Sequence, residues 1–207
     1  MEILYRGAES ILYADMFEDQ KVLVKDRIKK GYRIDQIDQE LRKTRTRKEV
    51  KLLTEARKIG VLTPKILHVD ETKSKIIMEF ISGKRIKELF FTADKKTIER
   101  CCLEIGKSIG KLHSMGIIHG DLTTSNMILK DEKIYFIDFS LGEFSKRIED
   151  QGVDLKLLIE ALKSTHFKIL KTCWDNILKG YRQEYNKAEE VLTKIDEIEK
   201  RGRYVER

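Results

Sequence analysis

Three oxygen-bearing side chains at fixed spacing constrain this chain more than any other feature. They are Asp121, Asn126 five residues later, and Asp138 twelve residues beyond Asn126. The two segments that carry them have the sequences His119-Gly120-Asp121-Leu122-Thr123-Thr124-Ser125-Asn126 and Asp138-Phe139-Ser140-Leu141-Gly142. Because two short apolar stretches and a turn separate these segments, we expect a β-hairpin to bring the three side chains to one edge.

The hairpin determines what chemistry the three side chains can share. Asn126–Leu129 and Lys133–Ile137 are separated by two acidic residues, a pattern that predicts a tight turn between two strands. Two of the three side chains can share a hard divalent cation such as Mg²⁺, while the remaining carboxylate accepts a proton or orients an attacking hydroxyl. The arrangement favours phosphoryl transfer. The alternative is that Asp121 and Asn126 are ordinary turn residues and Asp138 a cap at a strand end.

Length and composition place these segments in a folded protein. The chain has 207 residues, of which 41% are hydrophobic, and at roughly 150 residues per domain this is between one and two domains. No apolar run approaches the roughly 18 residues that a membrane-spanning helix needs. The first residues lack the basic-then-apolar order of a signal peptide. We therefore expect a soluble, cytoplasmic protein with no membrane partner.

The hydrophobic pattern changes near residue 82. Before it, short strands surround one long helix, expected over Ile37–Ile59; after it, apolar residues recur at helical spacing, as from Ile98 to Leu112 and from Phe167 to Tyr181. The expected strands are Glu2–Tyr5, Ser10–Met16, Val22–Lys25, Lys65–Asp70 and Lys75–Phe80. We expect a single α+β domain over 1–207, with a small antiparallel-sheet N-lobe (about 1–81), a minimal helical C-lobe (about 84–199) and a basic tail (200–207).

Positive charge is concentrated in one segment. Residues 21–51 contain twelve Lys and Arg against five acidic residues, which equals the whole net charge of +7. Such a patch suits a polyanion, although solvated helix faces are often rich in Lys and Arg with no ligand at all. The tail, Lys200–Arg207, adds a second basic stretch with an aromatic residue, and it equally fits a frayed terminus.

The two central segments resemble the protein-kinase superfamily, whose catalytic loop has His-x-Asp followed by Asn five positions after the Asp, and whose metal-binding Asp opens Asp-Phe-Gly. The resemblance implies that ATP and Mg²⁺ are the cofactors, that Asp121 is the catalytic base, and that Asn126 and Asp138 are metal ligands. Val22-Leu23-Val24-Lys25 resembles the strand whose Lys contacts the α- and β-phosphates, and Glu49 its ion-pair partner on the helix. The alternative for both residues is ordinary surface charge.

The resemblance extends to the hinge but not to every kinase feature. Ile76–Ile81 resembles the inner strand and hinge, where the backbone of Glu79 and Ile81 would bind adenine. Arg6-Gly7-Ala8-Glu9-Ser10 stands where a glycine-rich loop is expected, so the cover over the phosphates must be a shorter and different turn. Gly120 replaces the Arg that receives an activation-loop phosphate in regulated kinases, which makes regulation by that route unexpected.

A narrower resemblance covers essentially the whole chain. The segment from His119 to Asn126, Asp-Phe-Ser-Leu-Gly, the helix segment Arg45–Leu53 and the terminal Arg-Gly-Arg-Tyr are similar to the small kinase-like subunit of the KEOPS complex. That family implies an atypical Ser/Thr kinase or ATPase that supports threonylcarbamoylation of an adenosine in transfer RNA (tRNA). Its partners would be the carbamoyl-transferring subunit and the other KEOPS subunits. The absence of a fused second domain resembles the free-standing archaeal form.

This resemblance also suggests an RNA contact and leaves alternatives. The basic helix region and three tail residues become candidate tRNA contacts, namely Lys200, Arg201 and Arg203. One alternative is a RIO-type kinase acting on ribosome precursors, and another is a small-molecule kinase, although the chain lacks the length for that group's extra helices. A third is a non-catalytic scaffold that holds a nucleotide as a structural ligand.

Overall fold

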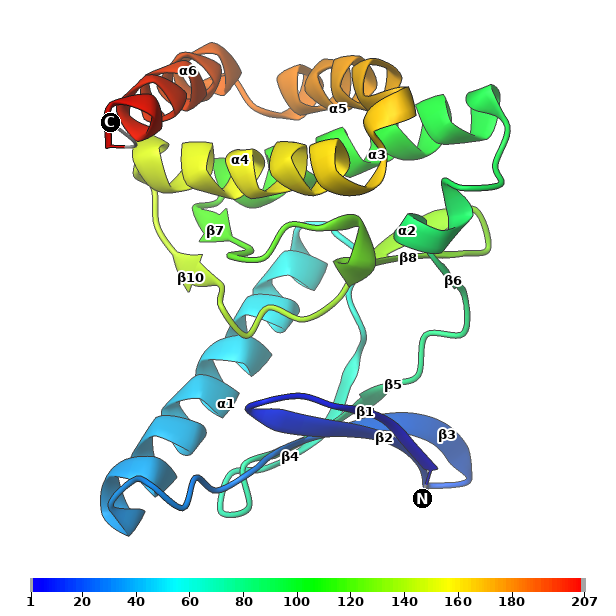
Figure 1. Ribbon diagram of the computed structural model, residues 1–207. Coiled ribbons are helices and arrows are strands. Elements are labelled where there is room, and N and C mark those ends of the chain that lie inside the picture. Colours follow the sequence, from blue (N-terminus) through cyan, green and yellow to red (C-terminus); the bar gives the residue numbers. More distant parts are fainter. Residues whose placement is uncertain (1, 206–207) are drawn as a thin grey trace.

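The computed structural model describes the backbone of residues 2–205 and the side chains of residues 2–198. The N-lobe contains a five-stranded antiparallel sheet with the strand order β1-β2-β3-β5-β4 (Figure 1). Its strands are β1 (Glu2–Arg6), β2 (Ser10–Phe17), β3 (Gln20–Arg27), β4 (Ile66–Asp70) and β5 (Lys75–Glu79). Each lies within one or two residues of the strand expected from the sequence.

Helix α1 (Asp35–Lys58) runs from the sheet to the C-lobe (Figure 1). Near its C-terminal end, Leu52 and Leu53 are buried in the same hydrophobic cluster as the C-lobe helices. The segment after the helix also contacts the C-lobe, because the backbone N–H of Phe136 donates to the carbonyl oxygen of Leu62 at 2.8 Å. The last turns of α1 therefore form part of the C-lobe core.

The rest of the C-lobe is mainly helical. Its helices are α2 (Ile86–Leu89), α3 (Lys95–Ser114), α4 (Ile148–Thr165), α5 (Leu170–Glu184) and α6 (Ala188–Val205). The apolar stripe expected between Ile98 and Leu112 is buried on α3. The expectation for Phe167 is wrong: this residue lies in a short 3₁₀ turn before α5 and is 68% exposed, because the chain reverses there between α4 and α5.

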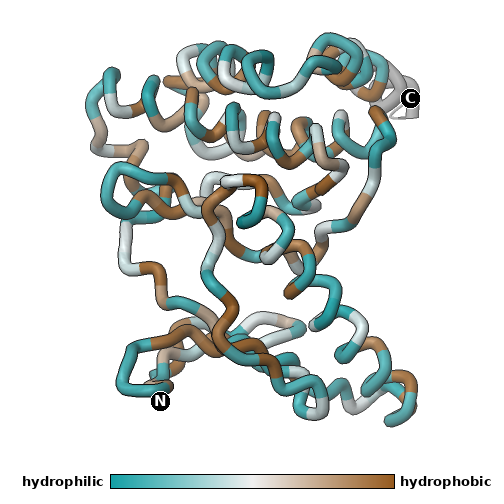
Figure 2. Tube along the Cα trace, turned by 180° about the vertical axis from the view of Figure 1, so that it is seen from behind, coloured by the Kyte–Doolittle hydropathy of each residue, from teal (hydrophilic) through white to brown (hydrophobic). Residues whose placement is uncertain are grey.

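Two small sheets carry the central segments. Strands β6 (Lys84–Arg85), β8 (Met127–Lys130) and β9 (Lys133–Phe136) form one sheet, and β7 (Ile117–Ile118) pairs with β10 (Glu143–Phe144) in the other. The expected hairpin is therefore present, but Asn126 lies in the 3₁₀ turn η1 (Thr124–Asn126) just before it, and Asp138 lies two residues beyond β9. Figure 2 shows hydrophobic segments gathered toward the inside of both lobes. The α+β, two-lobed, kinase-like fold is confirmed.

Among the described residues, no helix combines the length and the apolar character needed to cross a membrane.

Helices α3 and α5 pack with their backbones in contact. A Cβ atom at Gly106 would lie 1.9 Å from the carbonyl oxygen of Ile177, and one at Gly180 would lie 2.1 Å from the carbonyl oxygen of Leu103. Neither oxygen can move away without shifting its own helix. The two glycines therefore set how closely these helices approach.

We predict that Gly106→Ala destabilises the protein by about 1–3 kcal/mol, although Ala favours a helix over Gly, because the added methyl group forces α3 and α5 apart. Urea denaturation followed by circular dichroism measures the free energy of unfolding. The matched control is Gly31→Ala, since a Cβ atom at Gly31 meets nothing within 4 Å; its effect should stay within about 0.5 kcal/mol. Equal stabilities for the two variants would contradict the packing argument.

Candidate active site

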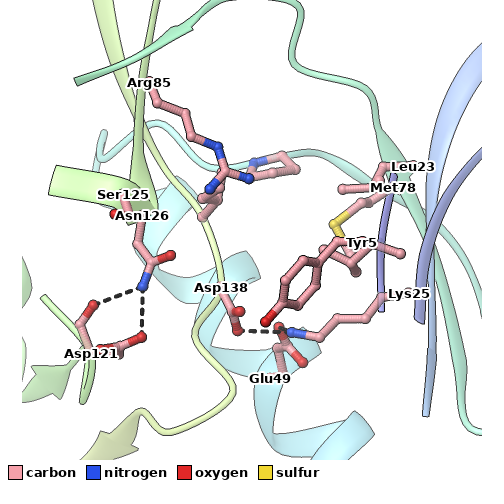
Figure 3. A pocket seen from close by; sticks show the side chains of 13 residues that line it. Tyr5, Leu23, Lys25, Glu49, Met78, Arg85, Asp121, Ser125, Asn126 and Asp138 are labelled. Carbon is pink, nitrogen blue, oxygen red and sulfur yellow. Dashed lines mark hydrogen bonds and ion pairs between the residues drawn. The ribbon is translucent and has the colours of Figure 1, made fainter. Parts of the chain in front are cut away.

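The side chains that the sequence places in a functional site meet in the cleft between the lobes (Figure 3). A cavity of about 300 Å³ is lined by thirteen residues, and these include Lys25, Glu49, Asp121, Asn126 and Asp138. The first two come from β3 and α1 of the N-lobe. In the C-lobe, Asp121 and Asn126 come from the segment before β8, and Asp138 comes from the segment after β9. Elements far apart in the chain therefore contribute to one site.

Lys25 joins the two lobes at the centre of the site. Its Nζ atom lies 2.7 Å from Oε1 of Glu49 and 2.8 Å from Oδ1 of Asp138. Burial alone would lower the pKa of Lys25, but the two carboxylates outweigh burial and raise it. The ammonium group is therefore charged, and the alternative that Lys25 and Glu49 are ordinary surface charges does not hold, since their side chains are 5% and 1% exposed.

Glu49 has a second cationic partner that sequence reasoning missed. Nη2 of Arg27 lies 2.5 Å from Oε2 of Glu49, so both carboxylate oxygens are held. Alternate residues of a strand point to the same face, and Arg27 is two residues after Lys25 on β3. That spacing is a signal the sequence does contain. A buried carboxylate with both oxygens paired avoids much of the cost of lost hydration.

Asp138 combines an unusual backbone conformation with a strongly acidic carboxyl group. Its φ of 63° lies in the left-handed region, which Asp tolerates better than most residues. Burial by itself would raise the pKa of Asp138, but the charge of Lys25 and hydrogen bonds from Lys25 and Ser140 lower it to about 2. The Ser140 hydroxyl donates to Oδ1 of Asp138 at 2.5 Å. The serine that replaces glycine in Asp-Phe-Gly therefore helps to hold the carboxylate.

Asn126 orients Asp121. The Nδ2 group of Asn126 donates to Oδ2 of Asp121 at 2.8 Å and to the Asp121 carbonyl oxygen at 3.0 Å. With its nitrogen used in this way, Asn126 directs its amide oxygen into the cleft (Figure 3). Within the part of the chain that the structure describes, no group of three or more His, Cys, Asp or Glu side chains could hold a metal ion.

The donor set nevertheless fits Mg²⁺. This ion takes oxygen ligands, and proteins often bind it through one or two side chains together with substrate phosphates and water. The Asp138 carboxylate and the Asn126 amide oxygen are such ligands.

Asp154 of α4 holds the backbone of the loop before Asp121. Its two carboxylate oxygens accept the N–H groups of His119 at 2.8 Å and Gly120 at 2.9 Å. Gly120 has a φ of 80°, and a Cβ atom there would lie 2.3 Å from the Leu141 carbonyl oxygen, so this loop requires glycine. Sequence reasoning did not assign Asp154 a role. The signal is its place four residues before Leu158, on the buried stripe of a helix.

His119 links the same loop to the strand that precedes Asp138. Its Nδ1 atom accepts the N–H of Asp121 at 3.3 Å, and its Nε2 atom lies 3.2 Å from the carbonyl oxygen of Ile137. Burial lowers the pKa of His119, so the neutral ring with the proton on Nε2 satisfies both contacts. The ring therefore fixes the distance between the segments that carry Asp121 and Asp138.

The two expected hinge residues, Glu79 and Ile81, line a more apolar cavity of about 200 Å³ that shares part of its lining with the first. The backbone N–H of Glu79 donates to the Lys65 carbonyl oxygen at 2.8 Å, so this N–H group is not available to a ligand. The structure brings both residues to the cleft. Their contact with adenine stays a prediction.

Much of the positive charge in residues 21–51 is used inside the N-lobe. Seven of the twelve basic side chains have a carboxylate within 4.0 Å: Lys25, Arg27, Lys29, Arg33, Arg42, Arg45 and Arg47. The segment is therefore less available to a polyanion than its composition indicates. The side chains of Lys200, Arg201 and Arg203 lie outside the described residues, so their contact with tRNA stays a prediction.

Comparisons with known proteins agree with this geometry. The RIO domain family matches residues 12–142. The chain is 48% identical to the KEOPS complex subunit Bud32 of Pyrococcus abyssi, over 100% of this chain and 98% of that protein. It is also 42% and 38% identical to probable bifunctional tRNA threonylcarbamoyladenosine biosynthesis proteins of Methanothermobacter thermautotrophicus and Methanocaldococcus jannaschii. The match covers 99% of this chain and 37% of each of those longer proteins.

The resemblance to the small kinase-like KEOPS subunit is confirmed by these matches. A RIO domain and a similarity to Bud32 are compatible, because the RIO domain match lies within the part of the chain that matches Bud32. The chain therefore belongs to the RIO-domain family and, within it, to the group of proteins similar to Bud32.

Proposed function

We propose that this chain binds ATP with Mg²⁺ in the cleft between its lobes and transfers or hydrolyses the γ-phosphoryl group, as an atypical Ser/Thr kinase or ATPase. One observation carries the proposal: a buried, charged Lys25 lies between Glu49 and Asp138, in the same cavity as the Asp121–Asn126 pair. This is a cation and a set of oxygen ligands suited to a metal-bound polyphosphate.

Each residue has a role in this proposal that follows from its contacts. Lys25 would bind phosphate oxygens while Glu49 holds its ammonium group in place. Asp138 and the amide oxygen of Asn126 would hold Mg²⁺, which neutralises charge on the phosphates when bound. The Asp121 carboxylate, oriented by Asn126, would orient the attacking hydroxyl or water and accept its proton.

We further propose that the chain acts in KEOPS, in the formation of threonylcarbamoyladenosine in tRNA. Support comes from the relatives, one a KEOPS subunit that matches end to end and others named for tRNA threonylcarbamoyladenosine biosynthesis. Its partners would be the carbamoyl-transferring subunit and the other KEOPS subunits. The RNA contact and a cytoplasmic location are part of the same proposal.

We predict that Asp121→Asn lowers the turnover of ATP by about 10²–10⁴-fold, because the amide cannot accept a proton. The measurement is phosphate release by the purified chain with its partner subunit and Mg²⁺. Asp131→Asn is the matched control, since Asp131 lies in the turn between β8 and β9, outside the cleft lining, and Asn tolerates its φ of 48°. A loss of less than tenfold would mean that the base lies elsewhere. Equal hydrolysis by Asp121→Asn, Asp138→Ala and the wild type would refute this site, whereas the absence of turnover in the wild type would favour the scaffold alternative.

We predict that Lys25→Met abolishes turnover and destabilises the fold by about 2–4 kcal/mol at pH 7, because it removes the cation that the buried Glu49 shares with the partly buried Asp138 and leaves only Arg27 to pair with Glu49. The pKa of Asp138 in the folded protein, about 2, is below the ordinary aspartate value of 3.8. The stability that this carboxylate gains from Lys25 is therefore present above about pH 4 and is lost as the pH falls toward 2.

Urea denaturation of wild type and variant between pH 6 and pH 2.5 measures this difference, which should narrow as the pH falls. Lys29→Met is the control. It removes an ion pair with Asp35 whose side chains are 56% and 76% exposed, so its effect should be small across the range. A wild-type advantage that is constant with pH would contradict the assignment.

We predict that deleting residues 200–207 weakens tRNA binding and lowers the slope of log affinity against log salt, because fewer phosphates are neutralised. Filter binding of tRNA at several salt concentrations measures both quantities. Replacing only Lys200, Arg201 and Arg203 by Gln in the full-length chain separates their charge from the length of the tail. An unchanged slope would dismiss the tail as an RNA contact.

A further inference from the structure

The cleft contains a second cationic side chain, Arg85, which has no role in the proposed function. Arg85 ends β6, just after the hinge segment, and its side chain extends into the cleft near Ser125 and Asn126 (Figure 3). It lines both the polar cavity that holds Asp138 and the more apolar cavity beside Glu79. Arg85 therefore borders the place where the two cavities meet.

Arg85 is also free to bind a ligand. The charge of the Lys25 ammonium is already shared with the carboxylates of Glu49 and Asp138. Among the described residues, no carboxylate forms an ion pair with Arg85. The polar cavity is lined by three carboxylates and only these two cations. A triphosphate entering it needs positive charge beyond that of Lys25 and a metal ion, and Arg85 is the side chain that can supply it.

The turn between β1 and β2 does not supply a second phosphate-binding group. The connection between β1 and β2 contains Glu9, whose carboxylate is bound at 2.5 Å by Arg45 of α1. Gly7 is the single glycine in this turn, so no run of glycines exposes backbone N–H groups to a phosphate as a glycine-rich loop does. Residues 7–9 are not among the residues that line the polar cavity, so a covering turn of this kind would leave the phosphates to be bound from another side of the cleft.

We propose that Arg85 binds the phosphate chain of the nucleotide, doing from the C-lobe side what a glycine-rich loop does from the N-lobe. This inference rests on the proposed function. A guanidinium group presents parallel N–H donors that match two phosphate oxygens, and its charge does not depend on pH in the physiological range. Arg85 thereby sets the preference of the site for nucleotides with phosphates over nucleosides.

The test compares the affinities of the full-length chain for ATP with Mg²⁺ and for adenosine by isothermal titration calorimetry at 150 mM salt. Arg85→Ala should weaken ATP binding at least tenfold and change adenosine binding less than twofold. Arg85→Lys should recover part of the loss, since it restores the charge but not the paired donors. The matched control is Lys84→Ala, which removes the adjacent charge on the same strand but from a side chain that lines neither cavity.

Three results would overturn the inference. The first is an Arg85→Ala variant that binds ATP as tightly as the wild type does. The second is an equal loss of ATP and adenosine affinity, which would assign Arg85 to the shape of the cleft. The third is an equal loss of ATP affinity in Lys84→Ala, which would indicate a general effect of charge. A wild-type chain that binds adenosine but not ATP would instead overturn the proposed function itself.

Discussion

The contact of Lys25 with Glu49 and Asp138 is the interaction on which the rest of the site depends. It joins β3, α1 and the segment after β9, so it fixes three elements from two lobes at one point. A buried charge that loses its partner is costly, because the interior cannot replace the hydration it gave up. The contact therefore has a narrow range of allowed geometries. The bonds from Arg27 to Glu49 and from Ser140 to Asp138 restrict the two carboxylates further.

The sequence predicts the parts of this structure that local spacing determines. Alternating strands, the stripe on α3 and the hairpin after Asn126 follow from the periods of strands and helices, and they bring Asp121 and Asp138 together. Partners set by the packing of distant elements were not predicted. Asp154 binds the backbone of Gly120 although it lies 34 residues later in the chain, and no residue close to Gly120 in the sequence indicates this contact. Likewise the exposure of Phe167 depends on where the chain reverses, not on its apolar period.

For the charged segment of residues 21–51, too, the sequence did not reveal the partners of its side chains. Composition indicates an excess of positive charge, but it does not distinguish a surface that binds a polyanion from a set of ion pairs within the protein. Arg33 and Arg42 both contact Asp38, which is fully buried, so these charges stabilise the start of α1. Their partner lies within the same segment, yet only the folded backbone brings all three side chains together.

Burial of the last turns of α1 in the C-lobe core limits how far this helix can move. In kinases that are switched by moving the equivalent helix, the glutamate swings away from its lysine. Here Glu49 lies one turn before Leu52 and Leu53, which are buried in the C-lobe, and each would cost about 1.5–3 kcal/mol to expose. Outward rotation of the helix would therefore expose apolar side chains that are buried in the C-lobe core. Burial of the helix end thus favours the pairing of Lys25 with Glu49, so control over this cleft would act on access to it and not on its assembly.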